Sequence, residues 1–225
     1  MNEPARSRGI KEDNAWIRVL GVDPAAAGPT GYGIVESDGQ CCRMLHYGAL
    51  RVATKRQKER AGAALQDVHR LLCRLIEEYA PDVMAVESIF SALNVRTALR
   101  LAEMRGVVLL AAAQHGLEVH SYAPREVKAS ITGHGHADKR QMQTMVRALL
   151  SMNVMPEPAD AADALAVALC HLQTEQARRR VGLPCKMDLG RPRAVAAAVE
   201  SPGRGDSVRM GDATRSGLPR ILSTR

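Results

Sequence analysis

The segment Ile17-Arg18-Val19-Leu20-Gly21-Val22-Asp23 is the strongest indication of the fold in this chain of 225 residues. Apolar and β-branched residues dominate it, which is typical of a strand buried inside a sheet. Asp23 closes the run, so its charge falls at the carboxyl end of the strand and therefore at the edge of the sheet. In open α/β folds, binding and catalytic sites form at this edge. The sequence predicts an α/β protein whose functional site includes Asp23.

Three further carboxylates stand at the ends of predicted elements. Glu87 closes a second apolar run at 83–86, and Asp160 and Asp163 open an alanine-rich helical pattern. Because Asp160 and Asp163 are three residues apart, a helix places them on one face with about 4.5 Å of axial rise between them. If these elements meet, the four acids form an anionic pocket that is costly unless a cation neutralises it. Mg²⁺ is the expected occupant because it prefers carboxylate oxygens.

Most of these acids also have a structural explanation when each is taken alone. Asp160 follows a proline-containing segment and suits the N-cap or first turn of a helix. Asp23 precedes a proline and suits the start of a turn. Glu87 is harder to explain in this way, because the apolar segment 88–90 follows it directly. Acids at three independent element ends favour a metal site.

The remaining pattern completes an α/β domain. We expect strands at 17–23, 31–36, 44–50, 83–87 and 118–122. Helices are expected at 64–76, 97–114, 124–131, 138–151 and 160–178, from apolar residues spaced three and four apart and from turn signals. Strands followed by strand–helix alternation predict a mixed five-stranded sheet with helices on both faces.

Charge divides the chain into parts. Residues 176–225 hold 11 Lys and Arg against 4 Asp and Glu, whereas residues 1–175 hold 20 of each, so the net charge of +7 belongs to the end of the chain. We therefore expect a flexible leader at 1–15, a folded domain at 16–175 and a basic, disordered tail at 176–225. The tail is interpreted either as a solvated extension or as a salt-sensitive arm for nucleic acid or another polyanion.

The sequence has no segment that resembles a signal peptide, and its cysteines do not follow the spacing of a metal-binding motif. The longest apolar runs, such as 107–113, are far shorter than the roughly 18 residues of a membrane span, and we expect a soluble, cytoplasmic protein. The five cysteines lack CxxC spacing, which favours reduced packing residues over a zinc site or a disulfide framework.

Several motifs taken together resemble the RuvC family of Holliday junction resolvases. They occur in the family's order over residues 17–175, as IRVLGVDP from Ile17, TGYG from Thr30, ESIF from Glu87, RG at Arg105, YAPREVK from Tyr122 and ADAADALA from Ala159. The resemblance implies an RNase H-like fold, a homodimer, and Mg²⁺-dependent nicking of two opposed strands of four-way junction DNA during recombination and repair. It also implies two Mg²⁺ ions per site, with Mn²⁺ as a substitute, and cooperation with the RuvA–RuvB branch-migration complex.

The resemblance also assigns site residues. The family's four acids fall on Asp23, Glu87, Asp160 and Asp163, and its helper lysines fall on Lys128 and Lys139. Its base-stacking aromatic residue falls on Phe90, although a lone phenylalanine is more often part of a core. Asn94 and Arg96 follow as candidate DNA contacts. In two-metal hydrolysis the ions activate water and neutralise the developing charge, and Asp23 is the best candidate to bridge them.

Two features depart from the family pattern or lie outside it. Ala25 stands where the family has glycine after the Asp-Pro pair, in a turn about one residue longer than usual, which predicts an altered turn beside Asp23 if that glycine has positive φ. The loop 133–136 is interpreted as a junction contact, and its two histidines lack a third ligand for a softer metal.

Three functions other than junction resolution are compatible with parts of the pattern. The chain could be an RNase H-like nuclease acting on RNA or another branched substrate, or a non-catalytic junction-binding module whose site Ala25 has spoiled. The turn after Asp23 with Gly31-Tyr32-Gly33 also resembles the first phosphate loop of actin-like and sugar-kinase ATPases. That architecture needs two such domains, for which one folded domain of ~160 residues is too short.

Overall fold

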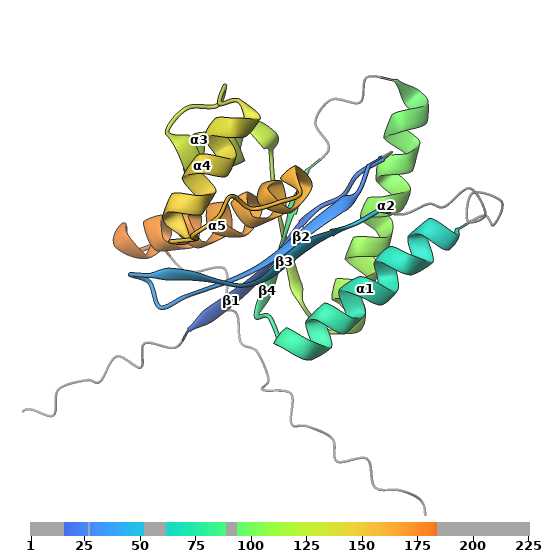
Figure 1. Ribbon diagram of the computed structural model, residues 1–225. Coiled ribbons are helices and arrows are strands. Elements are labelled where there is room, and N and C mark those ends of the chain that lie inside the picture. The colour runs from blue at the N-terminus through green and yellow to red at the C-terminus, as the bar shows by residue number, and fades with distance from the viewer. Residues whose placement is uncertain (1–15, 27, 52–61, 89–93, 184–225) are drawn as a thin grey trace, which may run out of the picture. The chain divides into compact units, whose positions relative to one another are not determined.

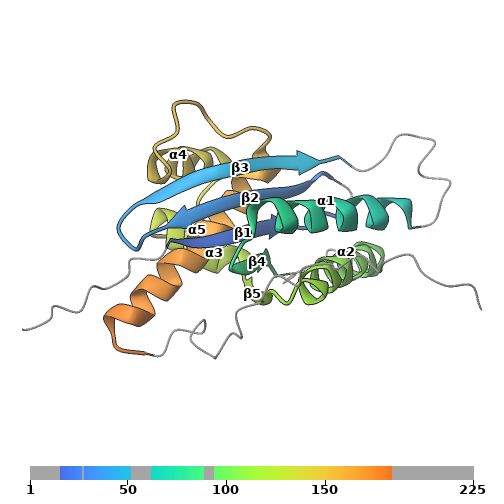
Figure 2. The ribbon, with the colours of Figure 1, turned by 90° about the horizontal axis from the view of Figure 1, so that it is seen from below.

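Five strands form one mixed sheet in the order β3-β2-β1-β4-β5 (Figure 2). The computed structural model describes residues 16–26, 28–51, 62–88 and 94–183. The strands are β1 (Ile17–Asp23), β2 (Thr30–Ser37), β3 (Cys42–Leu50), β4 (Val83–Glu87) and β5 (Glu118–Tyr122). The helices are α1 (Ala63–Tyr79), α2 (Val95–Gln114), α3 (Pro124–Thr132), α4 (Lys139–Leu149) and α5 (Ala159–Arg180).

The pairing of β1 determines where its carboxyl end lies. β1 is antiparallel to β2, with Asp23 opposite Gly31, and parallel to β4, with Val22 beside Val86. The first three strands form an antiparallel meander, and β4 and β5 extend it in parallel. Because β1 and β4 run in the same direction with this register, Asp23 and Glu87 end neighbouring strands at the same edge of the sheet.

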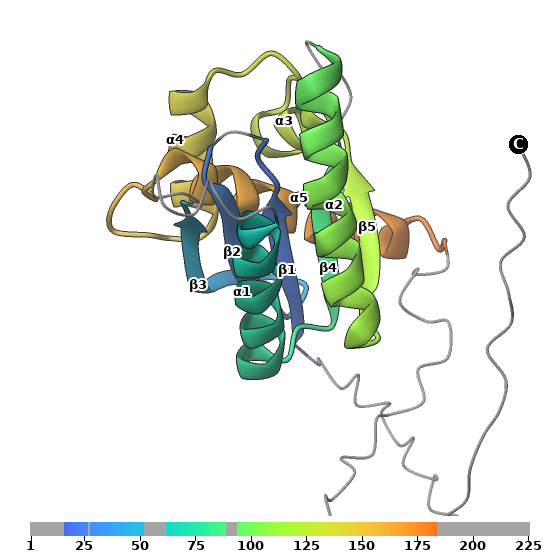
Figure 3. The same cartoon turned by 90° about the vertical axis from the view of Figure 1, so that its right-hand side faces the viewer.

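Helices cover both faces of the sheet. α1 and α2 pack on one face, and α3, α4 and α5 lie on the other (Figures 1 and 3). The two faces follow the alternation of side chains along β1: Val19 packs into the cluster on the α5 side, whereas Leu20 and Val22 pack into the cluster on the α1 side. α5 is buried along most of its length, which explains its alanine-rich sequence.

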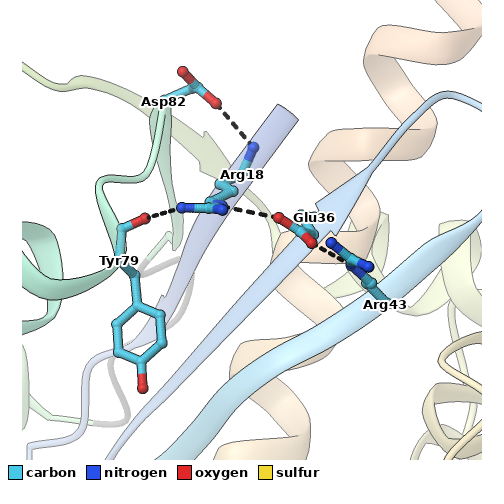
Figure 4. A network of polar contacts seen from close by, with 5 residues as sticks. All are labelled: Arg18, Glu36, Arg43, Tyr79 and Asp82. Atoms are coloured by element: carbon cyan, nitrogen blue, oxygen red, sulfur yellow. Dashed lines mark hydrogen bonds and ion pairs between the residues drawn. The ribbon is translucent and has the colours of Figure 1, made fainter. Parts of the chain in front are cut away.

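An ion-pair network around the buried Glu36 holds the opposite end of the sheet. Arg18 Nε donates to Glu36 Oε2 at 2.8 Å, and Arg18 Nη1 donates to the Tyr79 carbonyl oxygen at 2.9 Å (Figure 4). Arg43 also donates to Glu36, and the Arg18 backbone N–H donates to Asp82. Burial raises the pKa of Glu36, but the hydrogen bonds from Arg18 and Arg43 outweigh burial and leave that pKa below its ordinary value. The network joins three strands to the end of α1.

The predicted elements are present, with differences at their ends. α2 begins at Val95, two residues before the expected start, because the side chain of Asn94 accepts a hydrogen bond from the Thr97 N–H and caps the helix. Of the two positions expected for Asp160 in α5, the structure shows the first turn, and Pro158 takes the N-cap position. α5 continues to Arg180, so residues 176–180 are helical.

The described helices and cysteines bear on the expected membrane topology and thiol state. Within the described ranges, no helix combines the length and the apolar character needed to cross a membrane. The cysteines in those ranges are Cys41, Cys42, Cys73 and Cys170, and all four are free thiols. Cys185 lies outside the described residues.

Candidate active site

Asp23 and Glu87 form the centre of the site. They are the last residues of two parallel neighbouring strands, and their side chains share a hydrogen bond in which the Asp23 carboxyl donates to the Glu87 carboxylate. Burial raises the pKa of Asp23 to about 9, with further contributions from the charges of Glu87, Asp163 and Asp160. Burial also raises the pKa of Glu87. The pair therefore holds a proton at neutral pH in a region of concentrated negative charge.

The first turns of α5 add the other two acids. Asp160 lies in the first turn and Asp163 three residues later, and both act on Asp23 electrostatically. The pKa of Asp163 is raised, chiefly by burial and also by the charge of Asp160. The four acids predicted from the sequence thus approach one another from β1, β4 and α5. Their convergence depends on α5 crossing the sheet with its N-terminus at the carboxyl ends of the strands.

Two lysines bring positive charge to the same place. Lys128 lies on α3, and Lys139 is the first residue of α4, which Asp138 caps by accepting a hydrogen bond from the Gln141 N–H at 2.8 Å. Both lysines lower the pKa of Glu87 and that of Asp163, although burial keeps both values raised. Lys128 and Lys139 therefore lie near enough to Glu87 and Asp163 for their charges to act on these carboxylates.

The four carboxylates are the oxygen donors that the site offers to a metal ion. Among the described residues, no group of three or more His, Cys, Asp or Glu side chains is already arranged around one ion position. The raised pKa values nevertheless show four carboxylates in electrostatic contact, with Asp23 and Glu87 already hydrogen-bonded. Like-charged carboxylates repel one another, and a cation lowers this cost. Their chemistry fits a hard divalent cation, which takes oxygen ligands.

Comparison with known proteins identifies the family. The family model described as "Crossover junction endodeoxyribonuclease RuvC" matches residues 19–171. The chain belongs to the RuvC family. It is 44% identical over 157 residues to RuvC of Caldicellulosiruptor saccharolyticus, covering 69% of this chain and 92% of that protein. It is 46% identical over 168 residues to RuvC of Chloroflexus aggregans, covering 74% of this chain and 99% of that protein.

A solved structure of a RuvC protein supports the same assignment. The structure of Thermus thermophilus RuvC in complex with a Holliday junction substrate matches with a TM-score of 0.67 and 31% identity, covering 72% of this chain and 96% of that one. The predicted RNase H-like architecture, a mixed five-stranded sheet with helices on both faces, is confirmed. This RuvC family member is accordingly a nuclease.

The predicted DNA contacts Phe90, Asn94 and Arg96 follow Glu87 in the sequence, at and before the start of α2. Phe90 lies outside the described residues. Asn94 is exposed and uses its side-chain oxygen to cap α2, while Arg96 is exposed in the first turn of that helix. Both lie at the end of α2 that directly follows the segment after Glu87. Asn94 therefore has a structural role whatever its contacts with DNA.

Ala25 does not require an unusual backbone. The non-glycine residues with positive φ in the described ranges are Ala80 and Ser151, so Ala25 adopts an ordinary conformation. Ala25 therefore shows none of the strain that a positive φ would cause, and Asp23 keeps its register with Gly31. In the 133–136 loop, His134 is exposed and its Nδ1 contacts the Thr132 carbonyl oxygen at 3.1 Å.

Sequence reasoning missed a polar cluster on the α5 side of β5. The Tyr122 hydroxyl and His171 Nδ1 lie 2.7 Å apart, and the His171 ring packs against His120 with centroids 4.7 Å apart. Burial raises the pKa of Tyr122. A cavity of about 200 Å³ adjoins the cluster and is lined in part by Glu175 and Arg178. These residues are far apart in the sequence, so no local motif signals the cluster.

Proposed function

We propose that this RuvC family member resolves four-way DNA junctions by cutting two opposed strands symmetrically, using two divalent cations, with Mg²⁺ as the expected ion, at each active site. RuvC enzymes are metal-dependent nucleases. The observation that carries the proposal is the approach of Asp23, Glu87, Asp160 and Asp163 to one another, with the pKa of Asp23 raised to about 9, chiefly by burial and further by the neighbouring acids. Such a site favours a doubly charged cation in place of the proton.

Each acid has a defined part in this proposal. Asp23, at the end of a central strand, would contact both ions, while Glu87, Asp160 and Asp163 would complete their coordination. When bound, paired cations lower the pKa of water and neutralise charge on the attacking and leaving oxygens. The rigid strand and helix ends hold the carboxylates in place, which limits the reorganisation needed before reaction.

The lysines would act on the phosphate. Lys128 and Lys139 are close enough to lower the pKa of Glu87 and of Asp163, so their charges reach the place where a scissile phosphate would sit. A positively charged group near the phosphate stabilises the charge that develops in the transition state. We assign both lysines to phosphate contact beside the carboxylates.

The outer face of α2 supports a homodimer. Symmetric cutting of two strands needs two sites related by a twofold axis. Met104, Val108 and Ala111 pack inward, whereas four apolar side chains point outward and are each at least 38% exposed: Val95, Leu99, Leu109 and Leu110. A second copy of this chain is the occupant we propose for this face.

Other partners follow from the substrate. The Thermus relative was solved with a Holliday junction, and we propose four-way junction DNA as the substrate here. Phe90, Asn94 and Arg96 are proposed DNA contacts near the junction centre. We further propose that the basic segment 176–225, which lies beyond the matched residues 19–171, adds salt-sensitive contacts to DNA. Cooperation with a RuvA–RuvB branch-migration complex belongs to the same proposal.

Cleavage of a synthetic four-way junction tests the function. With Mg²⁺, the wild-type chain should make two symmetric nicks, whereas Asp23→Asn should bind the junction but not cut it. Glu77→Gln is the matched control, because this exposed carboxylate on α1 is remote from the site. Cutting of RNA or forks in preference to four-way junctions would instead favour an RNase H-like nuclease on another substrate. Retained nicking by pure Asp23→Asn would contradict the metal assignment.

A further inference from the structure

The backbone of β2 touches the backbone of α5 at Gly31. A Cβ atom added to Gly31 would lie 1.9 Å from the carbonyl oxygen of Asp160 and 2.5 Å from its carbonyl carbon. Both atoms belong to the main chain, so no side-chain rotation could relieve the overlap. Gly31 does not have positive φ, and the need for glycine here is a need for space.

Gly31 also lies beside another acid. In the pairing of β1 with β2, its register partner is Asp23. One residue therefore contacts the first turn of α5, which carries Asp160, and pairs with the strand residue at the centre of the site. Gly31 therefore lies between the backbone of Asp23 and that of Asp160, and its lack of a side chain lets the two come close together.

Gly21 on β1 also meets the main chain of α5: an added Cβ there would lie 2.1 Å from the carbonyl oxygen of Ala164, which is not one of the four acids. Gly33 and Gly28 differ from Gly31 in what they meet. At Gly33, an added Cβ would lie 2.7 Å from the Leu165 Cδ2 atom, the movable end of a side chain more than one turn farther along α5. At Gly28, in the turn before β2, the nearest atom would be the Ala25 Cβ at 3.8 Å, an ordinary contact. Gly31 is the position among these four where a methyl group must displace the main chain of an acidic site residue.

We propose that Gly31 is a positioning residue for the cation site, because it lets the first turn of α5 approach β1 closely enough for Asp160 to act with Asp23. The proposal rests on the cation-dependent function proposed above. Cβ atoms essentially never approach such neighbouring atoms within 3.0 Å, so the Cβ of an alanine at position 31 would push the Asp160 backbone away by about 1 Å. Displacements of about 1 Å can cost roughly 100-fold in rate.

Three alanine variants test the proposal. Gly31→Ala should raise the Mg²⁺ concentration for half-maximal junction cleavage by roughly 10–100-fold, as loss of support around metal ligands does. Junction binding without Mg²⁺ should not change, because the DNA-contacting side chains are unaltered. Gly33→Ala should lower the melting temperature with little change in Mg²⁺ requirement, and Gly28→Ala should alter neither.

A second substitution separates positioning from a general loss of stability. Glutamate is one methylene longer than aspartate, so Asp160→Glu in the Gly31→Ala background should recover part of the lost Mg²⁺ affinity. In the wild-type background, the same change should weaken Mg²⁺ affinity. The two effects should therefore be non-additive.

Several outcomes would overturn the positioning role. An unchanged Mg²⁺ requirement in folded Gly31→Ala would remove it, as would equal effects of Gly31→Ala and Gly33→Ala. Failure of Gly31→Ala to fold would assign the glycine to the fold and not to the site. The proposed function fails separately, if the wild-type chain does not cut junctions or Asp23→Asn still does.

Discussion

The carboxyl groups of Asp23 and Glu87 share a hydrogen bond across the ends of two parallel neighbouring strands. Two acids in this arrangement hold a proton between them when no cation is present, because neither can release it without adding charge to a buried site. Without a cation, these buried acids lower the stability of the folded chain, and a bound cation raises it. This trade-off leads to the first prediction.

Asp23→Asn should stabilise the folded chain in buffer containing EDTA. Folded Asp23 has a pKa of about 9 against an ordinary value of 3.8, so between these values the folded chain holds a proton that the unfolded chain has released. The free energy of unfolding therefore falls as the pH rises through this window. Thermal denaturation should show a higher melting temperature for the variant, with a difference that widens toward about pH 8. Added Mg²⁺ should raise the melting temperature of the wild type more than that of the variant. Equal melting curves of the two proteins in EDTA at all pH values would refute the predicted stabilisation by Asp23→Asn.

Lys128→Ala and Lys139→Ala should each slow cleavage while leaving cation binding intact. Loss of one positive group at a developing charge costs about 100-fold in kcat. The Mg²⁺ requirement should not rise, because removal of a nearby positive charge makes the carboxylates more attractive to a cation. Single-turnover cleavage at several Mg²⁺ concentrations separates the two effects. Arg147→Ala, which removes an exposed arginine in the last turn of α4, is the control for loss of a positive charge. If the lysine variants cleave as fast as Arg147→Ala, the lysines do not contact the phosphate.

A charge on the outer face of α2 should separate a dimer into monomers. Leu99→Glu and Leu110→Glu place a carboxylate among exposed apolar side chains, where a second copy would have to bury it without a partner. Light scattering at micromolar concentration should show a monomeric mass, and paired cutting should be lost before single nicking. Val154→Glu makes the same change at an exposed apolar residue away from α2. A wild-type chain that is already monomeric would contradict the assigned face.

Glu36→Gln should destabilise the fold by roughly 1–3 kcal/mol, because it removes the charged acceptor of two arginines. The Glu36 side chain is 1% exposed, whereas Arg18 and Arg43 are 41% and 61% exposed, so water compensates part of the loss. The folded pKa of Glu36 is lowered, so its stabilisation is present above the unfolded value of 4.5 and is lost as the pH falls through the folded value. Urea denaturation should show the difference from wild type shrinking in acid. Glu77→Gln, at an exposed residue of α1, is the control and should change the free energy of unfolding little.

Removal of residues 184–225 should weaken junction binding in low salt and reduce its dependence on salt. Each phosphate contact contributes about −0.9 to the slope of log K against log salt concentration, so loss of a few contacts should reduce the slope by roughly 2 or more. The family match ends at residue 171, and we expect the shortened chain to keep its cleavage rate when saturated with DNA. Identical salt slopes for the two chains would assign the segment no part in DNA binding.

Much of the fold could be predicted because its signals are local. The alternation around Leu20 and the apolar spacing of α1 depend on neighbouring residues, and so does the run that ends at Glu87. Element ends were less predictable, because the Asn94 cap that starts α2 competes with the propensity of nearby residues. Aspartate is a typical N-cap residue, yet α5 begins one residue before Asp160.

The acids, the lysines and the strands of this protein can be identified in its sequence, and the family resemblance was enough to predict the RNase H-like fold. The packing of the elements brings Asp23 and Glu87 together so that they share a proton, and it brings Lys128 and Lys139 near Glu87. It also decided that α5 approaches β2 closely enough to exclude any side chain at Gly31. The physical reason is that local patterns specify helices and strands. Distances between residues far apart in the chain depend on how those elements pack.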